Sequence, residues 1–185
     1  MQPLFFIAIV PPADISADIT AFKQHFAEEF GSVAALKSPP HITIVPPFRV
    51  TPEKIPELKQ WFDDFPLQHH PVEIYLSGFG AFFNKQPVVF VNPVLTPDLE
   101  LLYVKCSEAS KHITALPASQ RPFHPHVTIG FKDLSPQQFE KAWKIYKNKS
   151  YSARFTSNEL VLLQHSGKQW EITGSKSFNT LRSKS

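Results

Sequence analysis

Apolar residues in this chain follow two alternating spacings, one typical of helices and one of strands. Between 15 and 30 they recur every three to four residues and stop before Gly31, so we predict a helix there, with Asp14 or Ser16 as its cap. Three pairs of residues each combine a capping side chain with a proline suited to the first helical position. These pairs predict further helices from Thr51-Pro52, Thr96-Pro97 and Ser135-Pro136.

Short apolar or alternating runs lie between the predicted helices and indicate strands. They fall at 4–10, at the stretch around His41 that Pro46-Pro47 closes, and at 72–83, 88–91, 126–129, 151–155, 160–165 and 170–177. The turn 84–86 predicts a hairpin between two of them. Helices mixed with hairpins predict an α+β fold with small antiparallel sheets.

One five-residue stretch occurs twice in nearly the same form, as Pro40-His41-Ile42-Thr43-Ile44 and as Pro125-His126-Val127-Thr128-Ile129. Random placement of the 8 His and 9 Thr would give only about 0.4 His-x-Thr triplets, so a repeated frame is informative. Residues two apart in a strand share a face. Imidazole and hydroxyl in each copy can therefore point at one group.

A third triplet, His112-Ile113-Thr114, serves as an internal control. It ends the helical pattern that starts at Thr96-Pro97, and residues two apart on a helix point about 200° apart. His112 and Thr114 are therefore not expected to act together.

Composition limits the possible classes of protein. A chain of 185 residues with 42% hydrophobic content predicts one folded domain over 1–178, followed by a polar tail, 179–185. A net charge of +3 favours a phosphate-bearing ligand only mildly. The single cysteine excludes an intrachain disulfide, and the apolar start runs into Pro11-Pro12 and is too short to span a membrane. We therefore expect a cytoplasmic protein that is not a membrane protein, and we predict no obligate protein partner.

The paired motifs, Ser38-Pro39-Pro40-His41-Ile42-Thr43-Ile44 and His124-Pro125-His126-Val127-Thr128-Ile129-Gly130, resemble those of the two-histidine phosphoesterase superfamily, which includes 2'-5' RNA ligase-like proteins and cyclic nucleotide phosphodiesterases. The resemblance implies a bilobal, pseudo-symmetric fold in which each lobe places one motif in a central cleft. It also implies action on 2',3'-cyclic phosphates or related phosphodiesters of nucleotides or RNA ends without a metal, and in some members 2'-5' joining of RNA.

Histidine chemistry leads to the same prediction independently. Opening a cyclic phosphodiester requires a base for the attacking water and an acid for the departing oxygen, and two histidines satisfy both needs. We therefore predict that His41 and His126 are the general acid/base pair. Thr43 and Thr128 are predicted phosphate binders, because hydroxyls can donate to phosphate oxygens that gain charge in the transition state. Which histidine is the acid depends on how the substrate is oriented.

Several alternatives remain open at this stage. One is a non-catalytic RNA- or nucleotide-binding module, and another is that the two threonines only fill strand positions. His124 and His126 can bind a metal, yet no nearby Asp, Glu or third His completes a ligand set, so no cofactor is predicted. Lys85, Arg121 and Lys132 are candidates to supply positive charge near a small ligand. Phe48, Phe82, Phe90 and Phe131 are candidates for base stacking if they reach the cleft, but in a chain with 17 Phe core packing is the expected role of each.

Overall fold

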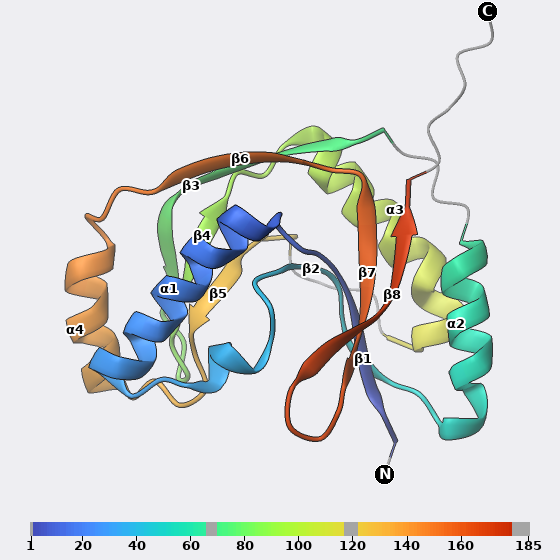
Figure 1. Ribbon diagram of the computed structural model, residues 1–185, viewed down its shortest axis with the longest axis horizontal. Helices are drawn as coiled ribbons and strands as arrows, with labels where there is room; N and C mark the ends of the chain where they lie inside the picture. Colours follow the sequence, from blue (N-terminus) through green and yellow to red (C-terminus); the bar gives the residue numbers. More distant parts are fainter. Residues whose placement is uncertain (1, 66–69, 117–121, 179–185) are drawn as a thin grey trace, which may run out of the picture.

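Two four-stranded antiparallel sheets form the centre of the protein, which we describe from a computed structural model covering residues 2–65, 70–116 and 122–178 (Figure 1). The elements are β1 (Leu4–Ile9), α1 (Ala13–Phe30), η1 (Ala34–Lys37), β2 (Ile42–Arg49), η2 (Pro52–Lys54), α2 (Ile55–Asp64), β3 (Val72–Phe82), β4 (Val88–Pro93), α3 (Pro97–Thr114), β5 (Val127–Gly130), α4 (Pro136–Tyr146), β6 (Ser152–Ser157), β7 (Glu159–His165) and β8 (Trp170–Ser177). The predicted α+β class is confirmed.

The strand order is β2-β1-β7-β8 in the first sheet and β5-β4-β3-β6 in the second. The two lobes therefore share one plan. A strand, a long helix and an edge strand follow one another as β1-α1-β2 and again as β4-α3-β5, and each copy of the motif lies at its edge strand. Each helix crosses to the other lobe, since α1 packs against β5 and α3 packs against β2. This exchange ties the lobes together along the line where the motifs meet.

The remaining helices cover the outer parts of the lobes (Figure 1). In that view α2 and α3 lie beside the first sheet, and α1 and α4 lie beside the second. Strand β6 leads into β7 through Asn158 alone, so the chain passes from one sheet to the other almost without a loop.

Most predicted helices are confirmed, but two of their starts differ from the prediction. Neither Asp14 nor Ser16 caps α1, whose N-cap is Pro12, and the Ser16 hydroxyl instead donates to the Pro11 carbonyl at 2.8 Å. The helix predicted from Pro52 is split into the 3-10 turn η2 and α2. Pro56, the second residue of α2, explains the split. It lacks an N–H, and its ring crowds the carbonyl four residues earlier.

Strand β2 does not end at Pro46-Pro47 as predicted but continues to Arg49. Because β2 is an edge strand, its prolines need no hydrogen bond on the open side. The β1–β2 register also shifts in this region, between the pairs Phe5–Phe48 and Ile7–Val45 and again before Ala8–Thr43. These irregularities admit the two prolines within a continuous strand.

Side chains alternate across β1 and separate two apolar layers. Phe5, Ile7 and Ile9 belong to the main core, whereas Phe6 and Ala8 point to the other face and pack with Val161 and Leu163 in a small second cluster. The second face of the sheet is therefore lined by side chains from β1 and β7 and carries Thr43 beside Ala8.

Helix α1 lies very close to β5 at Gly130. A Cβ added at this glycine would come within 2.3 Å of the Phe26 ring on α1. This contact requires glycine at the end of the second motif and fixes β5 against the helix that comes from the other lobe.

The predicted polar tail, 179–185, lies outside the described residues. Within the described part of the chain, no helix combines the length and the apolar character needed to cross a membrane.

Candidate active site

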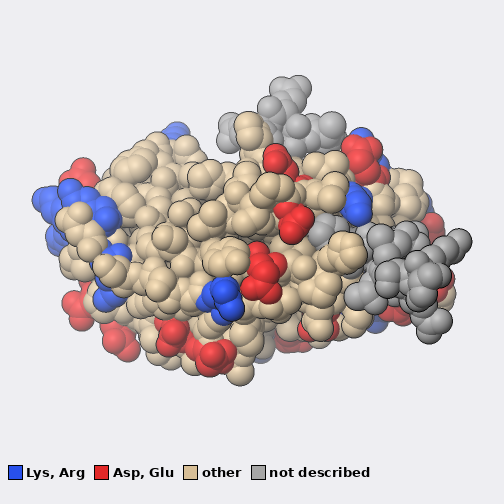
Figure 2. Space-filling view, turned by 90° about the horizontal axis from the view of Figure 1, so that it is seen from above, with Lys and Arg blue, Asp and Glu red and all other residues tan. Residues whose placement is uncertain are grey.

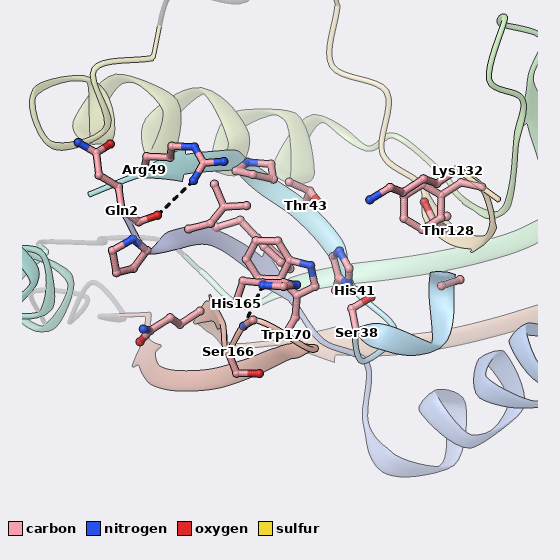
Figure 3. Close-up of a pocket in the computed structure, with 18 residues that line it drawn as sticks. Gln2, Ser38, His41, Thr43, Arg49, Thr128, Lys132, His165, Ser166 and Trp170 are labelled. Atoms are coloured by element: carbon pink, nitrogen blue, oxygen red, sulfur yellow. Dashed lines mark hydrogen bonds between the residues drawn. The ribbon is translucent and has the colours of Figure 1, made fainter. Parts of the chain in front are cut away.

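A cavity of about 740 Å³ opens on the second face of the first sheet and reaches the edge of the second sheet. His41 and Thr43 from the first copy of the motif line it together with Thr128 from the second (Figure 3). The structure therefore brings three of the four predicted site residues to one cavity although they lie far apart in the sequence. The fourth, His126, is not among the residues that line it.

The His41 side chain is held from one side and open on the other. Its Nδ1 lies 2.7 Å from the Pro39 carbonyl oxygen, and its ring packs 4.7 Å from the Phe6 ring. A carbonyl oxygen only accepts hydrogen bonds, so Nδ1 must be the donor, and Nε2 of the neutral ring is a proton acceptor. His41 directly precedes β2, and Ile42, which follows it, is fully buried in the opposite layer.

His126 repeats this arrangement in the second lobe. Its Nδ1 lies 2.8 Å from the His124 carbonyl oxygen, and it directly precedes β5. Its ring packs against Phe82 at 5.2 Å and against Phe90 at 5.6 Å. The same tautomer argument leaves Nε2 as its reactive nitrogen. Although both histidines were expected within their strands, each lies one residue before its strand begins.

Electrostatics connects the two histidines. Burial is the main reason why the pKa of His41 falls from 6.5 to about 4. The hydrogen bond from His41 to the Pro39 carbonyl raises the pKa, whereas the charges of Lys23 and His126 lower it further. Burial also lowers the pKa of His126, with the His124 charge as a smaller cause. The effect of His126 on His41 shows that the two imidazoles lie within electrostatic range of each other.

Thr43 and Thr128 occupy equivalent positions on the two edge strands. Each is half-buried between two apolar neighbours that are fully buried, Ile42 and Ile44 around Thr43 and Val127 and Ile129 around Thr128. Both threonines line the cavity. Strand alternation therefore directs the hydroxyls to the cavity and the aliphatic side chains to the core.

Positive side chains lie at two places along the cavity. Lys132 lies on the Thr128 side and Arg49 at the other end, where its Nη1 donates to the Gln2 carbonyl at 3.1 Å (Figure 3). None of the described residues that line the cavity is Asp or Glu. Of the predicted cations, Lys132 is therefore at the site, the exposed Lys85 is not among the lining residues, and Arg121 lies outside the described residues.

An aromatic wall, formed by Phe6, His165 and Trp170, lines part of the cavity, and His165 and Trp170 can be seen near His41 in Figure 3. The Trp170 ring is 4.5 Å from the Phe6 ring and 5.0 Å from the His165 ring. The wall was missed in the sequence because its three residues come from β1, β7 and β8, and only the β7–β8 pairing places His165 opposite Trp170.

The phenylalanines proposed for base stacking have different roles. Phe131 lines the cavity, whereas Phe48 is buried in the core and stacks on Phe5. Phe82 and Phe90 pack against each other and against His126. Core packing, the expected role of these residues, therefore holds for Phe48 and Phe90, and of the four stacking candidates Phe131 is the one that lines the cavity.

Asp133 joins the loop after β5 to the segment before the first motif. Its carboxylate accepts hydrogen bonds from the Ser32 hydroxyl at 2.8 Å and from the N–H groups of Val33 and Ala34 at 3.0 and 2.9 Å. The neighbouring Lys132 has φ +60°, an uncommon value for a residue with a side chain. Asp133 thus caps η1 across the lobes and anchors the loop that carries Lys132.

The other motif candidates do not form a second site in the described structure. Within the described ranges, no group of three or more His, Cys, Asp or Glu side chains is placed to hold a metal ion, so His124 and His126 have no third ligand there. The control triplet ends α3 as predicted. There His112 is exposed beside Trp61, and the buried Thr114 hydroxyl donates to the Ser110 carbonyl.

Comparison with known proteins identifies the family to which the chain is similar. A model of the 2'-5' RNA ligase superfamily matches residues 11–169. A protein of Geobacillus kaustophilus named "Putative phosphoesterase" is 23% identical over 141 residues, which cover 76% of each chain. The residues that the family model matches include both copies of the motif.

Solved structures share the fold at low sequence identity. E. coli LigT complexed with 3'-AMP aligns with a TM-score of 0.71 at 19% identity, covering 97% of this chain and all of that one. The protein TT0787 of Thermus thermophilus aligns with a TM-score of 0.67 at 16% identity, covering 96% and 98% of the two chains. The bilobal arrangement of two sheets is therefore that of the LigT-like fold.

Proposed function

The chain belongs to the 2'-5' RNA ligase superfamily, and from this premise we propose that it is a metal-independent phosphodiesterase that opens 2',3'-cyclic phosphates or related phosphodiesters of nucleotides or RNA ends. The observation that carries the proposal is that His41, Thr43 and Thr128 from two different sheets line one cavity, with the His126 imidazole within electrostatic range. A duplicated motif that converges on one cavity fits a substrate held between two equivalent groups.

The chemistry requires two proton transfers. A water oxygen attacks the phosphorus while the Nε2 of one neutral imidazole takes the proton from the water. The P–O bond to one ribose oxygen breaks, and that oxygen receives the Nε2 proton of the other, protonated imidazole. The products are a phosphomonoester and a free hydroxyl, and the histidines end with their protonation states exchanged. With an RNA hydroxyl in place of water, the same transfers join two strands.

The surroundings of the histidines support this use. Their Nδ1 atoms are occupied by backbone carbonyls, so both Nε2 atoms are free for proton transfer in a fixed tautomer. An anionic phosphate between the rings favours the protonated form of the one that acts as the acid. Thr43, Thr128 and Lys132 line the same cavity, which supports a role for the two hydroxyls as donors to the non-bridging oxygens and for Lys132 as a source of positive charge.

The charge pattern on the face seen in Figure 2 favours a small substrate or an RNA end over a long RNA. The face seen in Figure 2 carries Lys and Arg side chains in separate groups, with Asp and Glu side chains between them. Tight binding of a long phosphate backbone requires many cations along one path. We therefore propose that the positive charge that matters for binding is inside the cavity, from Arg49 and Lys132.

The experiment is hydrolysis of the four nucleoside 2',3'-cyclic phosphates, and of a short RNA ending in a cyclic phosphate, with EDTA present. We expect turnover by the wild type and a loss of about 100-fold or more in His41→Ala and in His126→Ala. His112→Ala is the matched control, because it removes the histidine of the third triplet, and it is expected to leave turnover unchanged.

A non-catalytic RNA- or nucleotide-binding module is the alternative from another class. Such a module would bind a 2',3'-cyclic phosphate without turning it over, and the same assay separates the two cases. Activity that disappears with EDTA and returns with one added metal would contradict the metal-independent mechanism.

A further inference from the structure

Lys23 occupies a core position on helix α1. The helix buries a stripe formed by Ile15, Ile19, Phe26 and Phe30, and Lys23 lies in the same stripe one turn after Ile19. Only 1% of this lysine is exposed. A fully buried lysine is rare unless it is paired, because removing an ammonium group from water is costly.

The partner of this buried ammonium is not a carboxylate. Its Nζ donates to the Ser38 carbonyl at 2.8 Å, and the salt bridges between described residues join other groups, Lys111 to Glu108 and Arg154 to Glu73. The charge on Lys23 is therefore not neutralised by an adjacent acidic side chain of the described chain. Burial lowers its pKa to about 8, so it still carries charge at neutral pH for most of the time.

The hydrogen bond of Lys23 lies directly behind the first histidine. Ser38 is followed by Pro39, whose carbonyl accepts the His41 Nδ1 proton. Lys23 also lines a smaller cavity of about 270 Å³ that shares Ser38 and Trp170 with the main cavity. The lysine from α1 thus holds the segment that sets the position of His41.

The second histidine has a different neighbour. The charge that acts on His126 is that of His124, an exposed residue. The groups that face His41 are Lys23 from α1, His126 from the second lobe, and Arg49, Lys132 and His165 around the cavity. Among these groups, Lys23 is the one that is fully buried and bonded to the backbone segment that leads into His41.

We propose that Lys23 is a positioning residue for the first of two otherwise equivalent histidines: its ammonium group fixes the Ser38–Pro40 segment, and its positive charge lies on the His41 side of the pair. This inference rests on the proposed function. The hydrogen bond to the Ser38 carbonyl holds the segment whose Pro39 carbonyl orients His41, and the lysine charge adds to the burial that disfavours the protonated His41 ring. The pseudo-symmetric fold supplies the pair, and one lysine outside the repeated motif makes the surroundings of its two members unequal.

The test separates the charge of Lys23 from its hydrogen bond. Lys23→Gln removes the charge and keeps an N–H donor, whereas Lys23→Arg keeps the charge. Lys37→Gln is the matched control, because it removes the charge of the exposed lysine in the same small cavity. In protein with isotope-labelled histidine, NMR titration follows His41 and His126 separately, with His41→Gln and His126→Gln used for assignment. This readout does not require turnover.

In the wild type we expect His41 to titrate at a lower pH than His126. Lys23→Gln should raise the His41 midpoint by on the order of one pH unit and move that of His126 less, while Lys37→Gln moves neither. The acid limb of kcat/KM for a cyclic phosphate should shift by the same amount in Lys23→Gln and remain in place in Lys23→Arg.

Two results would overturn the inference: an unchanged His41 midpoint in folded Lys23→Gln, or a wild type in which His126 titrates below His41. The second requires no variant, so the inference can be tested even if Lys23→Gln fails to fold. Absence of any turnover would instead contradict the proposed function. The two failures can be told apart, because the NMR comparison reports on the histidines without requiring turnover.

Discussion

His41 and His126 are fixed by the same hydrogen bond, from Nδ1 to the carbonyl oxygen two residues earlier, at 2.7 Å in one case and 2.8 Å in the other. Each bond sets the tautomer and leaves Nε2 free. Because the carbonyls belong to the rigid Pro-containing segments that lead into β2 and β5, the ring orientation is set before a substrate arrives. The first motif lies next to Lys23 and the second does not, so equal geometry is combined with unequal charge.

Replacing the site threonines by valine tests whether their hydroxyls matter. Thr43→Val and Thr128→Val keep the β-branched shape required by the strand and remove only the donor. We expect each to lower kcat for cyclic phosphate hydrolysis by about 10- to 100-fold with little effect on the melting temperature. Thr→Ser at either position should recover most of the activity. Full activity in both valine variants would show that the threonines only fill strand positions.

Trp170 is expected to act on the nucleoside part of the substrate. Its ring lines the cavity next to His165 and Phe6, and stacking of a base on an aromatic side chain contributes about 1–3 kcal/mol. Trp170→Leu should therefore raise KM for a nucleoside 2',3'-cyclic phosphate by about tenfold or more while kcat changes less.

A base-free control isolates this contribution. For methyl ribofuranoside 2',3'-cyclic phosphate, which has the same cyclic phosphate without a base, Trp170→Leu should leave KM near the wild-type value. Equal effects on both substrates would mean that Trp170 shapes the cavity and does not stack on the base.

The depressed pKa of His41 predicts a specific dependence of stability on pH. Folding lowers this pKa from 6.5 to about 4, so between these values the unfolded chain binds the proton and the folded chain does not. The free energy of unfolding therefore falls as the pH drops from about 6.5 to about 4. Burial lowers the pKa of His126 as well, and its contribution has the same sign.

Removal of the His41 imidazole should weaken this dependence. Urea unfolding at pH 7 and at pH 4.5 is expected to show a smaller loss of stability in His41→Gln than in the wild type, by on the order of 2 kcal/mol. His112→Gln, at an exposed position, should behave like the wild type. The same loss in all three proteins would contradict the low pKa of His41.

Asp133 is expected to stabilise the site across the lobes. Asp133→Ala leaves the Val33 and Ala34 N–H groups without their acceptor and frees the loop that carries Lys132. Loss of such a capping group costs about 1–2 kcal/mol. We expect this decrease in urea unfolding together with an increase in KM. Ser135→Ala, which removes the cap of α4 away from the cavity, should lower stability and leave KM unchanged.

The local chemistry of the chain was readable from the sequence because it depends on neighbouring residues. Helices that begin with a capping side chain and a proline, at Thr96 and Ser135, start as predicted. The α+β class follows from the spacing of apolar residues. The His-x-Thr frames were identified by their repetition, and the strand period of two gave the correct face for both threonines.

The sequence did not reveal the effects that depend on distant neighbours. Pro46-Pro47 should end a strand, yet β2 continues through them because it lies at a sheet edge. Lys23 carried one overlooked signal, a lysine in the apolar stripe of a helix, but its Ser38 partner follows only from the packing of α1.

The sequence by itself therefore determined which residues can do chemistry, since the duplicated motif fixes their types and their alternation within each lobe. Only the tertiary structure decided what surrounds them: the exchange of α1 and α3 between lobes, the aromatic wall drawn from three strands, and the buried ammonium of Lys23 behind His41. The physical reason is that local spacing sets the direction of a side chain, whereas burial and charge depend on groups that the chain brings together from far apart.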